Sequence, residues 1–118
     1  MANGARIRLS PTEFVLDTGA TAHLCDDSQR AQAREVHQIP YKPFQGVGGT
    51  IYARHSGILH GFDTYFVPDL GYNLISWRKL AQLGYELKSQ GPHVLICYSP
   101  TSSDLPEYRF ERSRNLYA

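Results

Sequence analysis

The stretch Phe14-Val15-Leu16-Asp17-Thr18-Gly19-Ala20 decides how this sequence is interpreted. Three apolar residues lead one carboxylate into a turn made of Thr, Gly and Ala. A carboxylate presented in this way can act as a general base toward water when ionised and as a general acid when protonated. The apolar run anchors the turn in the core and so gives the acid a rigid support.

Only one Asp-Thr-Gly turn occurs in the 118 residues. Activation of water by carboxylates in such turns uses two of these groups about 3 Å apart. The two groups share one proton, because both cannot ionise together. One chain therefore supplies half of such a site, and we expect a second copy to supply the other half. In that arrangement Thr18 donates its hydroxyl across the symmetry axis and Gly19 permits a close approach of the backbone. The alternative is an ordinary strand-ending turn with an exposed Asp.

Composition is that of a small globular domain. Apolar residues make up 42% and charged residues 19% of the chain, so we expect a single domain over residues 1–118, with 1–4 as a flexible lead. The net charge of +1 and the lack of a basic run argue against direct nucleic-acid binding. No apolar stretch is long enough to span a membrane, and the N-terminus lacks the apolar core of a signal peptide, so we expect neither. Cys25 and Cys97 are expected to be free thiols in a reducing, cytosolic setting, with a bridge between them as the alternative.

Short apolar runs separated by turn residues predict an all-β fold. One helix is signalled: Ser76 caps it, Trp77 and Leu80 begin an apolar face, and Gly84 ends it. We expect residues 21–36 to be loop with a short strand near Leu24. Because of its two prolines, 38–44 is at best an edge strand. The other expected strands are 5–9, 13–16, 51–53 and 57–59 on either side of a bend, 63–67, 72–76, 85–87, 93–98, 108–110 and 116–117.

A glycine-rich segment follows the acid turn along the chain. Its residues are Gly46, Val47, Gly48, Gly49 and Thr50. Such a hairpin tip can fold over a bound peptide and donate backbone hydrogen bonds to it, as a lid does. A phosphate-binding loop is the rival interpretation, but no helix signal follows the segment and no Lys lies within it. We expect the apolar tip residue Val47 to pack on a partner's hairpin or on substrate.

Other polar residues have plainer interpretations. His23 and Cys25 lie two positions apart, but no paired metal-ligand spacing accompanies them, so no metal or cofactor is expected. His23 is interpreted as a structural hydrogen-bonding residue near the acid turn. Asp26 and Asp27 lie in a polar segment without a Gly turn, so we interpret them as a solvated pair or a loop cap.

Together these motifs resemble the retropepsins, the homodimeric aspartic proteases of retroviruses and retrotransposons. The match is closer to copia-type long-terminal-repeat retrotransposons, whose Asp-Ser/Thr-Gly-Ala turn is followed by a His, here His23. The stretch Val67-Pro68-Asp69-Leu70-Gly71-Tyr72-Asn73-Leu74-Ile75-Ser76 and the closing Leu116-Tyr117 also fit that pattern. The resemblance runs from about Phe14 to Tyr117. Viral retropepsins usually have Gly in place of Ser76.

This resemblance implies an all-β, closed or open β-barrel with one short helix in the C-terminal half, forming half of a symmetric aspartic protease. Asp17 would be the catalytic acid, Thr18, Gly19 and Ala20 its loop, and residues 46–50 the flap over substrate. The implied partners are a second copy, joined through strands at the chain ends, and the Gag-Pol polyprotein, cut in cytoplasmic virus-like particles. The alternatives are a cellular retropepsin-like domain of a larger host protein, or an inactive domain for dimerisation or peptide binding.

Overall fold

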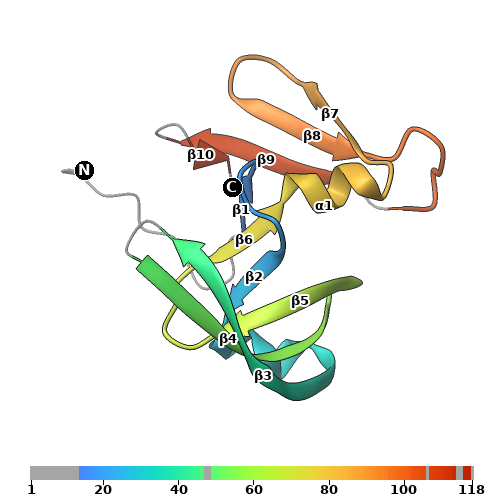
Figure 1. Ribbon diagram of the computed structural model, residues 1–118. Helices are drawn as coiled ribbons and strands as arrows, with labels where there is room; N and C mark the ends of the chain where they lie inside the picture. Colours follow the sequence, from blue (N-terminus) through green and yellow to red (C-terminus); the bar gives the residue numbers. More distant parts are fainter. Residues whose placement is uncertain (1–13, 47–48, 106, 114–115, 118) are drawn as a thin grey trace.

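The computed structural model describes residues 14–46, 49–105, 107–113 and 116–117, which form two β-sheets and two short helices (Figure 1). In chain order the elements are β1 (Phe14–Asp17), β2 (His23–Asp26), the 3-10 helix η1 (Asp27–Gln32), β3 (Arg34–Gly46), β4 (Gly49–Leu59), β5 (Phe62–Val67), β6 (Asn73–Ser76), α1 (Trp77–Gln82), β7 (Glu86–Ser89), β8 (Val94–Tyr98), β9 (Tyr108–Ser113) and β10 (Leu116–Tyr117). The prediction of a mostly β chain is confirmed. The expected strand at 5–9 lies outside the described residues.

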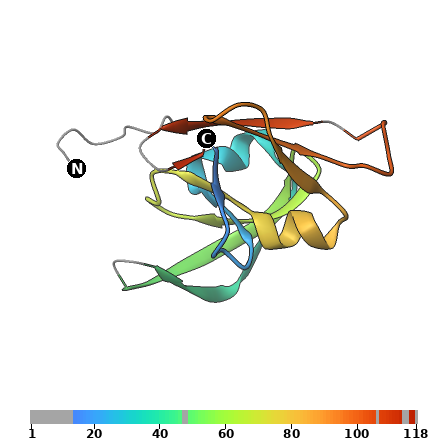
Figure 2. The same ribbon diagram turned by 90° about the horizontal axis from the view of Figure 1, so that it is seen from above.

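The larger sheet has six strands in the order β1-β6-β2-β5-β4-β3, and the smaller has four in the order β10-β9-β8-β7. In the larger sheet β1 pairs in parallel with β6, and β2 in parallel with β5, while β2 and β6 meet antiparallel. Both sheets are open in the described part of the chain, so a closed barrel, one of the two forms implied by the resemblance, is not found there. Figure 2 shows the hairpin of β3 and β4 on the side of the molecule away from the smaller sheet.

Helix α1 begins and ends as the sequence predicts. The side chain of Ser76 accepts the backbone N–H of Lys79 at 3.1 Å, which satisfies one of the unpaired donors at the helix start. At the other end, Gly84 has a φ of 92° and Tyr85 donates its N–H to the carbonyl of Leu80 at 3.1 Å. This is the Schellman pattern, in which glycine takes the left-handed position without steric cost.

The hairpin of β3 and β4 corrects one prediction and confirms another. The bend expected between 51–53 and 57–59 is wrong, because β4 runs unbroken from Gly49 to Leu59. Gly57 serves close packing instead: a Cβ there would lie 3.0 Å from the Val36 side chain and 3.1 Å from the Arg34 carbonyl oxygen. The edge position expected from the prolines is confirmed, since β3 is the last strand of its sheet and its register shifts between Gln38 and Lys42.

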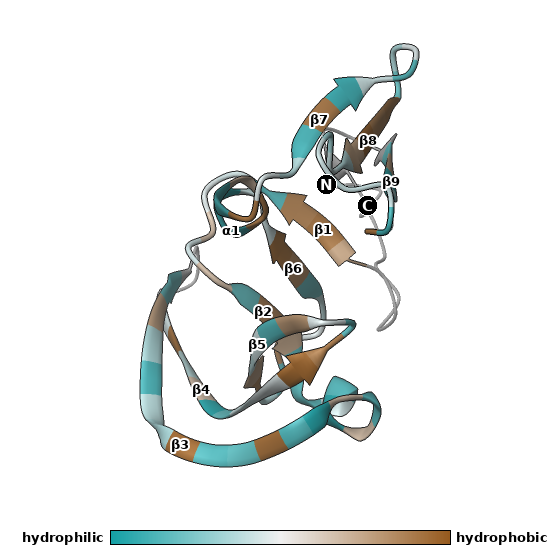
Figure 3. Ribbon diagram, turned by 90° about the vertical axis from the view of Figure 1, so that its right-hand side faces the viewer, coloured by the Kyte–Doolittle hydropathy of each residue, from teal (hydrophilic) through white to brown (hydrophobic). Residues whose placement is uncertain are grey.

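Two apolar clusters hold the fold together. One contains Leu80, Tyr85, Cys97 and Phe110 and joins α1 to the smaller sheet, and the other contains Cys25, Leu59 and Phe66 within the larger sheet. In Figure 3, β1 and β8 are mostly hydrophobic, whereas β3 is mostly hydrophilic, as expected for an edge strand. Cys25 and Cys97 are free, as predicted. Burial raises the pKa of Cys25 to about 12 and that of Cys97 to about 11, so both remain thiols.

Candidate active site

The acid turn lies at the end of β1. Asp17 is the last residue of the strand and pairs in parallel with Ser76, the last residue of β6. The Gly19 backbone N–H donates to Asp17 Oδ1 at 2.8 Å, so the turn itself holds the carboxylate. Asp17 and Ala20 are half-buried, and Thr18 and Gly19 are exposed. The turn therefore presents one fixed carboxylate at the surface of a single chain.

The space around Gly19 in a single chain would admit a side chain, although the sequence suggested that only glycine fits there. A Cβ at this position would lie 3.5 Å from Asp17 Oδ1, which is an ordinary van der Waals contact, and its φ is not in the left-handed region. Within one chain, space alone does not require glycine here. The close approach expected at Gly19 thus remains a prediction about the meeting of two copies.

Ser76 fastens the acid turn to the start of α1. Its side-chain hydroxyl donates to the carbonyl oxygen of Ala20 at 2.7 Å and accepts the N–H of Lys79 at 3.1 Å. Its own N–H donates to His23 Nδ1 at 3.1 Å. Ser76 is fully buried, and its bond to His23 is buried, whereas the bonds to Ala20 and Lys79 are part-buried. One serine joins the turn, β2 and the helix, a role that its prediction as a cap captured only in part.

His23 has the structural role that the sequence predicts. The ring is buried, with 6% of the residue exposed, and it lies 5.2 Å from the ring of Phe62. Because a backbone N–H can only donate, Nδ1 must be the acceptor and the neutral ring carries its hydrogen on Nε2. Burial, and then the nearby positive charge of Lys79, lower the pKa of His23 to about 4, against the opposing effect of Asp63.

Asp26 and Asp27 do not join Asp17 in a pair. Asp26 caps η1 by accepting the N–H of Ser28 at 3.0 Å, and it also accepts the N–H of Gly71 at 2.8 Å. The Ser28 side chain, as the largest cause, and then the Gly71 N–H lower the pKa of Asp26 by hydrogen bonding to its carboxylate. Asp27 accepts from Arg30 at 2.7 Å. The predicted loop cap is confirmed for Asp26.

The predicted flap is the hairpin of β3 and β4. Gly46 pairs with Gly49, and Gln45 donates to the Thr50 hydroxyl at 3.1 Å, so the hairpin is paired to within two residues of its tip. Gly49 has a φ of 117°, a conformation that favours glycine. Val47 and Gly48 lie outside the described residues, so the packing expected of Val47 stays a prediction.

Sequence reasoning missed an aromatic and basic cluster on the same hairpin. Phe44 of β3 lies 5.3 Å from the ring of Tyr65 on β5, and the Lys42 ammonium lies 5.5 Å from the Tyr65 ring and 5.8 Å from the Phe44 ring. On the same hairpin Arg54 stacks 4.9 Å from the ring of Tyr41. The pairing of β3 with β4 and of β4 with β5 brings these residues together, and no local motif signals it.

Phe62 of β5 lines three cavities, of which one extends to β9 and another to α1, and Asp17 lines none of the three. The described residues contain no group of three His, Cys, Asp or Glu side chains arranged to hold a metal ion. In the same part of the chain, no helix has both the length and the apolar character needed to cross a membrane.

Comparison with known proteins finds a transposon relative. The chain is 40% identical over 73 residues to the putative transposon Ty5-1 protein of Saccharomyces cerevisiae, and the alignment covers 55% of this chain and 47% of that protein. The chain thus matches about half of the length of this relative. No family model matches the chain. No solved structure matches it either. The similarity relates the chain to a transposon protein, as the motif resemblance implied.

Proposed function

We propose that this chain is an aspartic endopeptidase that is active as a symmetric homodimer. The observation that carries the proposal is the acid turn: a half-buried Asp17 at the end of a strand, oriented by the Gly19 N–H and fixed to α1 through Ser76. In the dimer, one Asp17 deprotonates a water held between the two carboxylates. The other donates a proton or a hydrogen bond to the scissile carbonyl, so no covalent intermediate or metal is needed.

The hairpin of β3 and β4 supports the proposal from the substrate side. It is an antiparallel pair with a glycine on each side of its tip, Gly46 and Gly49, a form suited to folding over an extended peptide. With the transposon relative, these features lead us to propose the Gag-Pol polyprotein of a retrotransposon as the natural substrate. Cleavage would then take place in cytoplasmic virus-like particles.

The deciding experiment measures activity and molar mass together across a dilution series of the purified chain. We expect pepstatin-sensitive peptide cleavage whose specific rate falls in step with the dimer fraction, because each chain supplies one acid. Activity should be highest below neutral pH, since one proton must stay on the pair of carboxylates. Full specific activity from a demonstrated monomer, or a rate that rises steadily to pH 9, would contradict the proposal.

A further inference from the structure

A cavity of about 460 Å³ lies between the two sheets, away from Asp17. Its volume is in the range of about 300–1,000 Å³ that small-molecule sites occupy. Exposed residues, His60 and Glu107, line it beside buried ones, so it opens to solvent. The apolar side chains in its wall come from strands of both sheets: Phe14, Leu59, Phe62, Ile75, Tyr108 and Phe110.

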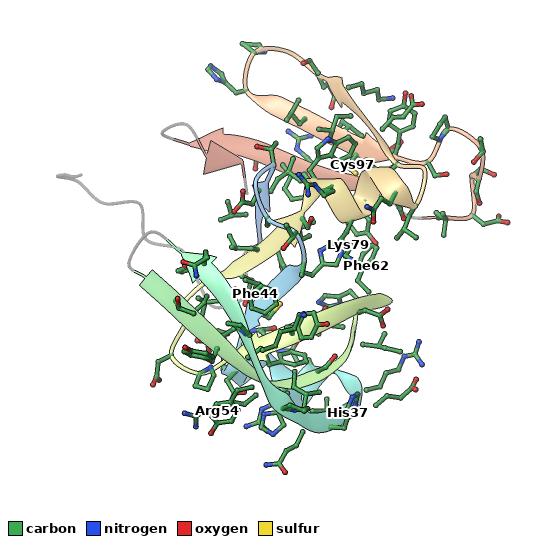
Figure 4. The ribbon with its side chains drawn as sticks, viewed as in Figure 1. His37, Phe44, Arg54, Phe62, Lys79 and Cys97 are labelled. Carbon is green, nitrogen blue, oxygen red and sulfur yellow. The ribbon has the colours of Figure 1, made fainter. Side chains whose placement is uncertain are left out.

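One polar ring in this wall has a free donor. His23 is 6% exposed, its Nδ1 is occupied by the Ser76 N–H, and its hydrogen is therefore on Nε2. Within the described part of the chain, no residue accepts from Nε2. His23 lines this cavity and also a neighbouring one of about 290 Å³, into which Lys79 extends from α1 opposite Phe62 of β5 (Figure 4). This N–H is not fully enclosed by protein, so a ligand oxygen in the cavity can accept from it.

The charged and aromatic residues that line the two cavities restrict the class of ligand. Glu107 and Arg109 line the larger cavity, and Asp63 and Lys79 line its neighbour, so each space has one charge of each sign and favours a neutral occupant. Phe62 lies 5.8 Å from the ring of Tyr108. Such walls suit a further aromatic ring, because tilted and edge-to-face ring contacts are favourable.

We propose that this cavity binds a small, neutral aromatic amide, whose carbonyl oxygen accepts a hydrogen bond from His23 Nε2 while its ring packs against Phe62 and Tyr108. The site is separate from the acid turn but connected to it. His23 holds Ser76 through its other nitrogen, and Ser76 holds the carbonyl of Ala20. A bound amide therefore adds a contact at one end of the chain of hydrogen bonds that positions the turn.

The test is a titration of the isotopically labelled chain with N-acetylphenylalanine amide, followed by NMR. We expect saturable shifts of the His23 Nε2–H resonance and of the Ser76 amide. Toluene, which has no acceptor, and the charged N-acetylphenylalanine should bind at least tenfold more weakly. Ile75→Phe, which fills the cavity, should weaken amide binding at least tenfold. The matched change Ile51→Phe, on β4 and outside the cavity wall, should leave it unchanged.

Three results would overturn the inference: no saturable shift up to millimolar amide, toluene binding as tightly as the amide, or equal effects of the two Ile→Phe changes. Should Ile75→Phe fail to fold, the comparison of the three probes on the unaltered chain still decides. None of these readouts depends on peptide cleavage. The proposal that the cavity binds an amide and the proposal of protease activity are therefore tested independently.

Discussion

The backbone N–H of Ser76 donates to Nδ1 of His23 across 3.1 Å, joining two buried residues that are 53 positions apart in the chain. Ser76 also pairs with Asp17 between β6 and β1. The position of the acid turn is thus not set by the turn alone. It also depends on β2, which follows the turn in the sequence, and on β6, which lies far from it in the sequence. Substitutions at Ser76 and His23 should therefore alter the position of Asp17.

Replacing Ser76 with Ala removes the hydroxyl that accepts from Lys79 and donates to Ala20. Loss of a helix cap costs about 0.5–2 kcal/mol, and loss of the part-buried bond to Ala20 adds about 1 kcal/mol. We expect Ser76→Ala to lower the free energy of unfolding by about 1–3 kcal/mol, measured by urea denaturation. The matched change Ser89→Ala, at an exposed position of β7, should change it by less than about 0.5 kcal/mol. Equal effects of the two changes would contradict this role of Ser76.

The free energy of unfolding should fall as the pH decreases, over a window set by the pKa of His23. Burial and Lys79 lower its pKa from 6.5 to about 4 in the folded chain. The unfolded chain therefore binds the proton first as the pH drops, and stability is lost between pH 6.5 and pH 4, with no further loss from this residue below pH 4. The loss should be on the order of 3 kcal/mol, measured by urea denaturation at a series of pH values.

Variants separate His23 from the other histidines. His23→Gln removes the titrating group, so the stability curve should flatten over this window, whereas the exposed His93→Gln should leave its slope unchanged. Lys79→Gln removes a cause of the lowered pKa and should narrow the window from its acid side. A curve that keeps its slope in His23→Gln would assign the pH dependence to other groups.

Local patterns predicted α1 almost completely, because its cap, apolar face and closing glycine are neighbours in the sequence. The edge strand followed from Pro40 and Pro43 for a similar reason, since a residue without an N–H cannot donate within a sheet. The strand that ends in a turn at Asp17 was also predicted, because Asp17, Thr18 and Gly19 are contiguous, while the acid chemistry of the turn stays a proposal.

Contacts between residues far apart in the chain could not be predicted from the sequence. A bend was expected between 51–53 and 57–59, yet β4 is unbroken there, and Gly57 lies inside it where the backbone of Val36 comes close. Helix η1 was missed because it depends on a capping bond from Asp26 and an ion pair between Arg30 and Asp27 rather than on an apolar face. Likewise, His23 signalled a structural role, but only the pairing of β2 with β6 identifies Ser76 as its partner.

Gly57→Ala tests the close packing of β3 on β4. The new methyl group would lie 3.0 Å from Val36 Cγ2 and 3.1 Å from the Arg34 carbonyl oxygen, and the backbone atom cannot move away without disturbing the strand. Overpacking of this kind costs about 1–3 kcal/mol, so we expect a lower midpoint in urea. Adding Val36→Ala relieves only the side-chain contact and should recover part of the loss. Wild-type stability in Gly57→Ala would show that β3 yields easily.

Asp17→Asn tests the proposed shared acid directly. The amide can still accept the Gly19 N–H that Asp17 Oδ1 accepts, so folding should be largely unchanged, while peptide cleavage should fall below a few per cent because the pair of carboxylates is gone. Asp69→Asn is the matched control: Asp69 is exposed and has a φ of 57°, which Asn tolerates well, so full activity is expected. Mixing gives a sharper result. In a fully exchanged, equal mixture of wild-type and Asp17→Asn chains, about one quarter of symmetric dimers keep both acids. Activity should then drop to about half of that from the wild-type chains alone, whereas activity unaffected by added Asp17→Asn chains would mean that each chain works by itself.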